Sequence, residues 1–172
     1  MIQDELVYQI LQEFRFTPTN DQANALRVFS EFMTDRDERA AMILRGCAGT
    51  GKTSLAGAMV RTLRRLSFKV ALLAPTGRAA KVFSLNSGFP ASTIHRRIYR
   101  EKAFNGADGR FNLNQNMYRD MLFMVDEASM VSLSSGNTAF GSGCLLDDLI
   151  EYVYGGTNCR MLLIGDKAQL PP

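Results

Sequence analysis

The chain has 172 residues, of which 46% are hydrophobic and 22% charged, an ordinary globular composition. This length predicts one domain that can bury a core without disulfides or metals. No run of about 18 apolar residues is present, and the first five residues carry neither a basic nor an apolar signal segment. The three cysteines are odd in number and widely spaced. These features argue against a membrane span, a secretory signal and a disulfide framework, and they make the cytoplasm the expected compartment.

The net charge of +3 conceals an uneven distribution of charge along the chain. Residues 61–110 contain 11 basic and 2 acidic side chains, whereas the rest of the chain contains 9 basic and 15 acidic ones. Such asymmetry is typical of a surface that binds a polyanion. A solvated basic face explains the charge alone equally well.

The first 38 residues are expected to be helical. Leu6, Ile10, Leu11 and Phe14 recur at helical spacing, and a second helix is predicted from about residue 20 to residue 33. A charged connector follows at 35–39, where the pattern of the sequence changes. We therefore divide the chain into a helical segment, 1–38, and a second unit, 39–172.

The second unit alternates short apolar runs with segments of helical character. The runs lie at 40–44, 70–74, 121–125 and 161–164. They lack polar alternation, which predicts α/β architecture with a parallel sheet covered on both faces. Two stretches interrupt this scheme: 102–115 carries turn signals and predicts a surface hairpin or loop, and 132–142 is rich in Ser and Gly and predicts a mobile loop.

The strongest local motif follows the first of these runs. It matches the P-loop pattern and comprises Gly46, Cys47, Ala48, Gly49, Thr50, Gly51, Lys52 and Thr53. The glycines let successive N–H groups point at one phosphate, and the helix expected from about 52 to 66 directs its positive end there. Lys52 is suited to neutralise the β- and γ-phosphates, and the Thr53 hydroxyl to coordinate Mg²⁺. The motif therefore predicts a nucleotide site.

Two carboxylates end the apolar run at 121–125, and they are expected at the same sheet edge as the P-loop. Asp126 is placed to hold Mg²⁺, and Glu127 to accept a proton from an attacking water. The run at 161–164 also leads into polar residues. Among them, Gln169 could hydrogen-bond a γ-phosphate.

In this order, the P-loop, Asp126-Glu127-Ala128-Ser129 and Gly165-Asp166-Lys167-Ala168-Gln169-Leu170-Pro171-Pro172 resemble motifs I, II and III of superfamily 1 helicases. The sequence most resembles the RecD-like branch (superfamily 1B), which includes the exonuclease V alpha subunit and Dda-type helicases. Leu73–Lys81 is similar to motif Ia of that branch, Ser92–Arg96 to its next DNA-facing motif, and Phe16–Gln22 to its Q motif. The resemblance implies a RecA-like P-loop NTPase fold, with a parallel sheet flanked by helices.

The resemblance also implies roles for individual residues. Gln22 would read the adenine edge, Lys52 and Thr53 would bind phosphate and Mg²⁺, and Asp126 would hold the metal. Glu127 would activate water, and Gln169 would sense the γ-phosphate. Single-stranded DNA would lie along Thr76, Gly77, Arg78, His95 and Arg96, all of which fall inside the basic stretch.

ATP, Mg²⁺ and single-stranded DNA are therefore the expected ligands, with 5′-to-3′ polarity by resemblance. By this resemblance, such motors use a second RecA-like domain, and the sequence shows no motif beyond the third. The chain is therefore expected to be the first motor domain alone. We expect it to hydrolyse ATP weakly and not to unwind duplex DNA. Two alternatives stay open: another P-loop enzyme, such as a nucleotide kinase or a GTPase, and a non-catalytic nucleotide-dependent binding module. The pathway and any nuclease partner are not encoded in these motifs.

Overall fold

The structure of the chain is a computed structural model. The structure describes residues 2–37, 39–46, 51–101, 111–131 and 144–166. Its centre is a five-stranded, all-parallel sheet with the strand order β1-β7-β6-β2-β3. The strands are β1 (Ala41–Gly46), β2 (Lys69–Ala74), β3 (Ala91–Thr93), β6 (Met121–Val125) and β7 (Arg160–Asp166). The four predicted strands and the parallel sheet are confirmed, and the short edge strand β3 was not predicted.

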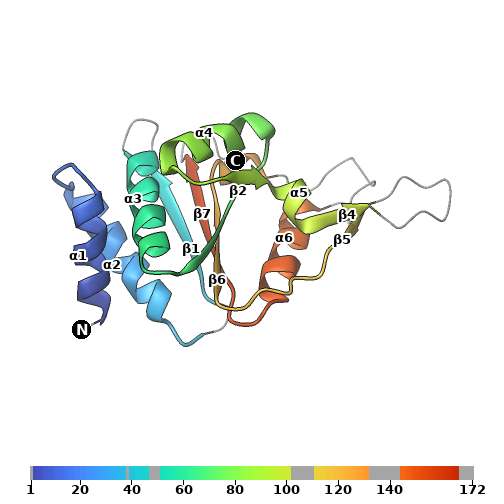
Figure 1. Cartoon of the computed structure of the whole chain (residues 1–172), viewed down its shortest axis with the longest axis horizontal. Helices are drawn as coiled ribbons and strands as arrows, with labels where there is room; N and C mark the ends of the chain where they lie inside the picture. Colours follow the sequence, from blue (N-terminus) through green and yellow to red (C-terminus); the bar gives the residue numbers. More distant parts are fainter. Residues whose placement is uncertain (1, 38, 47–50, 102–110, 132–143, 167–172) are drawn as a thin grey trace.

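Helices cover both faces of the sheet (Figure 1). On one side lie α1 (Ile2–Glu13), α2 (Asn20–Thr34) and α3 (Lys52–Arg65), and α4 (Gly77–Ser87) packs against α3. On the other side lie α5 (Ile94–Ile98) and α6 (Leu145–Tyr154). The two layers of helices bury the sheet between them, as expected for an α/β fold.

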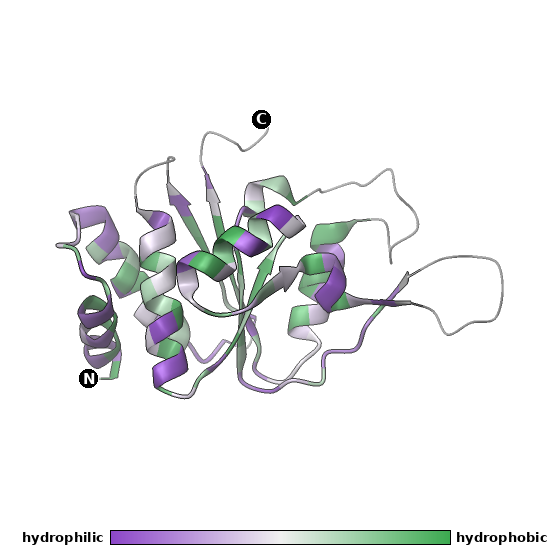
Figure 2. Cartoon of the chain, turned by 45° about the horizontal axis from the view of Figure 1, so that its top comes forward, coloured by the Kyte–Doolittle hydropathy of each residue, from purple (hydrophilic) through white to green (hydrophobic). Residues whose placement is uncertain are grey.

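Alternate residues of the strands feed two separate cores, because successive side chains point to opposite faces. Leu122 and Met124 of β6 pack with α1, α2 and α3, whereas Phe123 and Val125 pack with α5 and α6. All four are 3% exposed or less. The apolar strands therefore lie between two helical layers (Figure 2), which explains why the sequence of β6 shows no polar alternation.

The prediction that every strand is covered on both faces is wrong for β1. Met42 and Leu44 are buried in the core with α3, but Ile43 between them is 58% exposed. The reason is the position of β1, which is the edge strand next to β7 and extends beyond the cover of α6.

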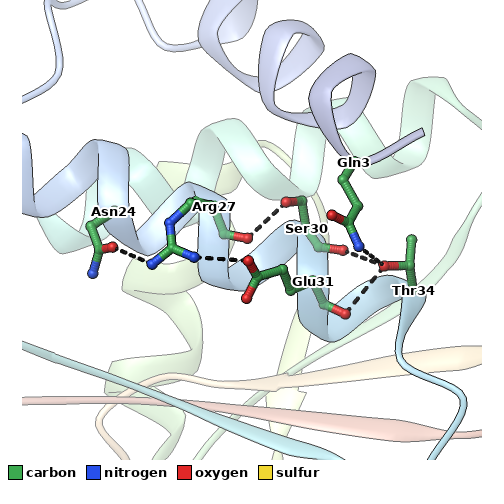
Figure 3. A network of polar contacts seen from close by, with 6 residues as sticks. All are labelled: Gln3, Asn24, Arg27, Ser30, Glu31 and Thr34. Carbon is green, nitrogen blue, oxygen red and sulfur yellow. Dashed lines mark hydrogen bonds and ion pairs between the residues drawn. The ribbon is translucent and has the colours of Figure 1, made fainter. Parts of the chain in front are cut away.

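The N-terminal helices are joined to the sheet by packing and by polar contacts. Leu6 and Ile10 of α1 and Phe29 of α2 belong to the same core as α3. Gln3 on α1 donates to Thr34 on α2 at 2.9 Å, within a network that also holds Arg27 (Figure 3). On the other side of α1, the Glu13 carboxylate pairs with Arg61 and Arg65 of α3. The division at residue 38 stays a prediction, although the two segments share one core.

The predicted hairpin is confirmed in its described part. β4 (Tyr99–Glu101) pairs antiparallel with β5 (Phe111–Leu113), and the pair projects away from the main sheet (Figure 1). Residues 102–110 between them, and the Ser- and Gly-rich stretch 132–142, lie outside the described residues. Within the described part of the chain, no helix is long and apolar enough to cross a membrane.

Candidate functional site

The strand order places the predicted motifs along one edge of the sheet. All five strands are parallel, so their carboxyl ends meet at this edge, where ligands bind in open α/β folds. Lys52 follows β1, Asp166 ends β7, and Asp126 follows β6, so the candidate nucleotide residues occupy one half of the edge. Thr76 follows β2 and His95 follows β3, and these candidate DNA residues occupy the other half.

The second half of the P-loop forms the start of α3. Gly51 precedes the helix with φ of +83°, a left-handed conformation that glycine adopts without strain. Lys52 Nζ donates to the Gly46 carbonyl oxygen at 2.8 Å, so the lysine side chain reaches back to the end of β1. Thr53 is exposed in the first turn of α3. Cys47, Ala48, Gly49 and Thr50 lie outside the described residues.

Gln22 lies directly against this loop. A Cβ atom placed on Gly51 would lie 2.6 Å from Gln22 Nε2. The side chain is held by a capping box at the start of α2: Thr19 N–H donates to Gln22 Oε1 at 2.9 Å, and Gln22 N–H donates to Thr19 Oγ1 at 3.2 Å. The structure therefore brings together two motifs that are almost 30 positions apart in the sequence.

A pocket of about 180 Å³ opens beside this contact. The turn after α1 supplies Phe14, Arg15 and Phe16 to its wall, and α3 supplies Thr53 and Ser54. The Phe14 and Phe16 rings meet edge to face, with centroids 5.8 Å apart, and Phe16 stays largely exposed. This places an aromatic surface next to the P-loop helix.

The carboxylates of the second motif lie within the electrostatic reach of Lys52. Burial raises the pKa of the Asp126 carboxyl, while its bond from the Glu127 N–H (2.9 Å) and the charge of Lys52 oppose the rise. Burial also raises the pKa of Glu127, as do the charges of Asp126 and Asp166, and Lys52 again opposes the rise. A carboxylate with raised proton affinity is better suited to accept a proton from water.

Glu127 has φ of +52°, which a non-glycine residue seldom adopts. The strained residue directly follows Asp126, whose N–H donates to the Leu73 carbonyl of the neighbouring strand at 2.9 Å. The 3₁₀ turn η1 (Ala128–Met130) begins immediately after it. Strain of this kind is concentrated at functional sites, and here it lies on the residue predicted to activate water.

Asp166 is the residue that the sequence reasoning left without a role. It ends β7, the strand between β1 and β6, and its backbone pairs with Gly46 of the P-loop strand. Its charge raises the pKa of Glu127, so the two carboxylates repel each other electrostatically. The signal was its place in the third motif, two residues after the predicted apolar run at 161–164. Gln169, which was assigned a role in that motif, lies outside the described residues.

The candidate DNA residues lie at the starts of two helices that begin side by side. Ala74 at the end of β2 pairs with Thr93 at the end of β3. Thr76 Oγ1 accepts from the Ala79 N–H and caps α4, and Thr93 Oγ1 accepts from the Arg96 N–H and caps α5, each at 3.1 Å. Arg78 and Arg96 are exposed in the first turns of these helices.

His95 differs from its arginine neighbours. It is half-buried, and its ring packs on Tyr99 with centroids 5.6 Å apart. Burial lowers the pKa of His95, so the neutral imidazole predominates at pH 7. A neutral ring supplies no charge to a phosphate, and its packing ties α5 to the start of the hairpin.

The oxygen-bearing side chains of the candidate site fit Mg²⁺ bound together with a nucleotide better than a metal ion held by protein side chains alone. Among the described residues, no three His, Cys, Asp or Glu side chains are grouped to hold a metal ion. Mg²⁺ commonly takes one or two protein oxygens and completes its shell with phosphate and water. The Thr53 hydroxyl and the Asp126 carboxylate, with Lys52 beside them, are suited to this arrangement.

Fold and motifs together define a P-loop nucleotide-binding protein with a RecA-type sheet. The chain belongs to the AAA domain family, whose sequence model matches residues 18–172. An ATP-dependent RecD2 DNA helicase from Deinococcus radiodurans is 35% identical over 132 residues, which are 76% of this chain and 16% of that protein. The crystal structure of the Pif1 helicase from Candida albicans shares the fold, with a TM-score of 0.53 and 22% identity over 91% of this chain and 34% of that one. The predicted resemblance to RecD-like helicases is thereby confirmed, and the chain spans only a small part of the length of these relatives.

Proposed function

We propose that this chain is the ATP-binding and ATP-hydrolysing motor domain of a DNA helicase, and that it contacts single-stranded DNA. The observation that carries the proposal is the convergence of Lys52, Asp126 and Glu127 at the ends of β1 and β6, on either side of β7, with Gln22 against Gly51. The RecD2 relative, itself a DNA helicase, supports this assignment. Neither alternative, a different P-loop enzyme or a non-catalytic module, is favoured by these comparisons.

Nucleotide recognition would begin at Gln22. Its Oε1 is an acceptor, which the Thr19 N–H already uses in this structure, and its Nε2 is a donor. An adenine edge presents one N–H donor beside one ring-nitrogen acceptor, which matches this amide. Phe16 would face the base from the adjoining pocket, and Lys52 would bind the β- and γ-phosphates.

Hydrolysis would depend on the carboxylates. Asp126 and the Thr53 hydroxyl would hold Mg²⁺, which neutralises developing charge on the phosphates. Glu127 would take a proton from the attacking water, helped by its raised pKa. Asp166, by its negative charge, would keep that pKa raised. Gln169 is proposed as the sensor of the γ-phosphate.

DNA would bind at the other half of the same edge. Thr76, Gly77, Arg78, His95 and Arg96 begin the helices that follow β2 and β3. The strand β2, which leads to Thr76, lies next to β6, which leads to Asp126. A movement of Asp126 that accompanies binding or loss of nucleotide would therefore occur beside the first of the DNA residues. This adjacency supplies a short path between nucleotide state and DNA contact.

Measurement of ATP turnover with and without single-stranded DNA tests the proposal. We expect ATP turnover that single-stranded DNA stimulates and that Lys52→Ala abolishes. Turnover that ignores DNA would favour another P-loop enzyme, and nucleotide binding without any turnover would favour a binding module. We further propose 5′-to-3′ polarity, a cytoplasmic location and a role in DNA repair or recombination, all by resemblance to the RecD-like branch.

A further inference from the structure

A second and larger pocket lies outside the nucleotide half of the sheet edge. It has a volume of about 520 Å³ and lies between α5, residues 114–118 and α6. Arg96 is the one residue that it shares with the candidate DNA residues named above. Its other walls include Arg97, Gln115, Met117, Tyr118 and Tyr152.

The wall of the pocket formed by residues 114–118 is held on both sides. Asn114 N–H donates to the Ile98 carbonyl at the end of α5, at 2.6 Å. The buried Asn116 side chain donates to the Val153 carbonyl on α6 at 3.1 Å and accepts from the Tyr118 N–H at 2.9 Å. These bonds fix the segment between two helices, so the pocket is preformed.

The pocket is lined by positive charge, and none of the described residues that line it is acidic. Arg97 donates to the Tyr118 hydroxyl at 3.3 Å, and its guanidinium lies 5.8 Å from the centroid of that ring. Arg96 is exposed at the rim. An anionic group would therefore find two arginines among the described residues of the pocket.

Apolar surface lies beside this charge. Met117 is 81% exposed and Tyr118 is 40% exposed, although both follow a segment that is firmly held. Tyr152 forms a buried part of the wall and packs edge to face on Phe123, with centroids 5.8 Å apart. Burial raises the pKa of Tyr152, so its hydroxyl remains a hydrogen-bond donor at neutral pH.

We propose that this pocket binds one nucleotide unit of a single-stranded nucleic acid, with the phosphate at Arg96 and Arg97 and the base against Tyr118 and Met117. Arginines beside an exposed aromatic ring are the combination by which proteins bind single strands. An acidic peptide would satisfy the arginines but leave the exposed ring without a stacking partner. The inference rests on the proposed function, because it extends the DNA surface from α5 to residues 115–118.

Photo-crosslinking of the whole 172-residue chain to a short oligothymidine carrying 5-iodouracil tests the proposal without any variant. We expect crosslinks at Tyr118 or Met117, located by mass spectrometry of the digested adduct. Crosslinks confined to residues 76–78 and 95–96 would overturn the pocket and leave the proposed function standing. The same experiment can be repeated with an acidic peptide that carries a photo-crosslinker. Labelling of residues 115–118 by this peptide but not by the oligonucleotide, in a chain that turns over ATP, would also overturn the proposal.

Binding of the same oligonucleotide to variants gives a second readout. Tyr118→Ala and Arg97→Ala are each expected to weaken binding by at least about fivefold, the low end of one stacking contact. Arg119→Ala is the matched control, because Arg119 is exposed in the same segment but does not line the pocket. Equal affinities for all three variants would overturn the proposal, and ATP turnover measured without DNA tests the nucleotide site separately.

Discussion

Gln22 and Gly51 are in such close contact that a single methyl group on Gly51 would lie 2.6 Å from the Gln22 amide nitrogen. The glutamine belongs to a capping box on α2, and the glycine ends the P-loop in a left-handed conformation. The contact joins the N-terminal helices to the phosphate loop. It also makes the position of Gln22 depend on the absence of a side chain at residue 51.

Gly51→Ala is therefore expected to destabilise the chain for two separable reasons. An alanine in the left-handed region costs about 1–2 kcal/mol, and the new methyl group would displace the Gln22 amide. The free energy of unfolding, from urea titration, should fall less when Gly51→Ala is made in a Gln22→Ala background. Equal losses in both backgrounds would show that the contact contributes nothing.

Gln22→Glu separates the capping role of this residue from its role in nucleotide recognition. A glutamate keeps the oxygen that accepts from the Thr19 N–H, so the capping box and the stability of α2 should persist. It loses the Nε2 donor, so affinity for ATP should fall and discrimination between ATP and other nucleotides should weaken. Nucleotide titrations at matched Mg²⁺ check this, and unchanged discrimination would remove Gln22 from the adenine site.

The sequence was sufficient to predict the four long strands because both faces of the inner ones are buried. Residues 121–125 form one uninterrupted apolar run, and β6 has these bounds. The three-residue strand β3 was missed because Ala91, Ser92 and Thr93 carry no hydrophobic pattern, and only pairing with β2 makes them a strand. The exposed face of β1 was missed because an edge position is a property of strand order.

The placement of the candidate site residues was predictable where a local motif follows a predicted strand. Lys52, Asp126 and Glu127 were predicted from local patterns, and the structure brings them together. The influence of Asp166 on Glu127 could not be predicted, because it depends on β7 lying between β1 and β6. The pocket beside Arg97 was equally hidden, since its walls come from three segments that are distant in the sequence.

Lys52→Ala and Glu127→Gln are expected to affect different steps of the reaction. Loss of the lysine removes the positive charge for the β- and γ-phosphates, so binding of ATP itself should be lost. The glutamine variant keeps that charge but cannot take a proton, so binding should persist while turnover falls by about 10²–10⁴-fold. Binding of a fluorescent ATP analogue and release of phosphate measure the two steps. Equal loss of binding in both variants would contradict these roles.

Glu127→Gln is also expected to stabilise the nucleotide-free protein at neutral pH. The folded chain raises the pKa of Glu127 above its ordinary value of 4.5, so ionisation of this carboxyl costs stability as pH rises through the folded pKa. The glutamine does not ionise, so its variant should unfold at a higher temperature at pH 7. The gain should shrink below about pH 4.5, where the carboxyl is protonated in the folded and the unfolded chain.

Thermal melts from pH 4 to pH 8 without nucleotide or Mg²⁺ check this dependence on pH. Glu151→Gln is the matched control, because Glu151 is an exposed glutamate on α6 and is not among the charges that shift the pKa of Glu127. A gain for Glu127→Gln that stays constant across this range would show that repulsion and burial at Glu127 do not limit stability.

Gly77→Ala and Arg78→Ala test the DNA half of the sheet edge without damage to the fold. A Cβ atom on Gly77 would meet no atom within 4 Å, so the alanine should be tolerated at the start of α4. It should weaken DNA binding only if the strand approaches the backbone at this point.

Arg78→Ala should lower affinity similarly for all sequences and reduce the slope of log affinity against log salt by about 0.7–1. Fluorescence anisotropy of a labelled oligonucleotide at several salt concentrations measures both effects. Arg27→Ala is the control, because Arg27 lies on α2 and pairs with Glu31. A slope that Arg78→Ala leaves unchanged would place the phosphate contacts elsewhere on the chain.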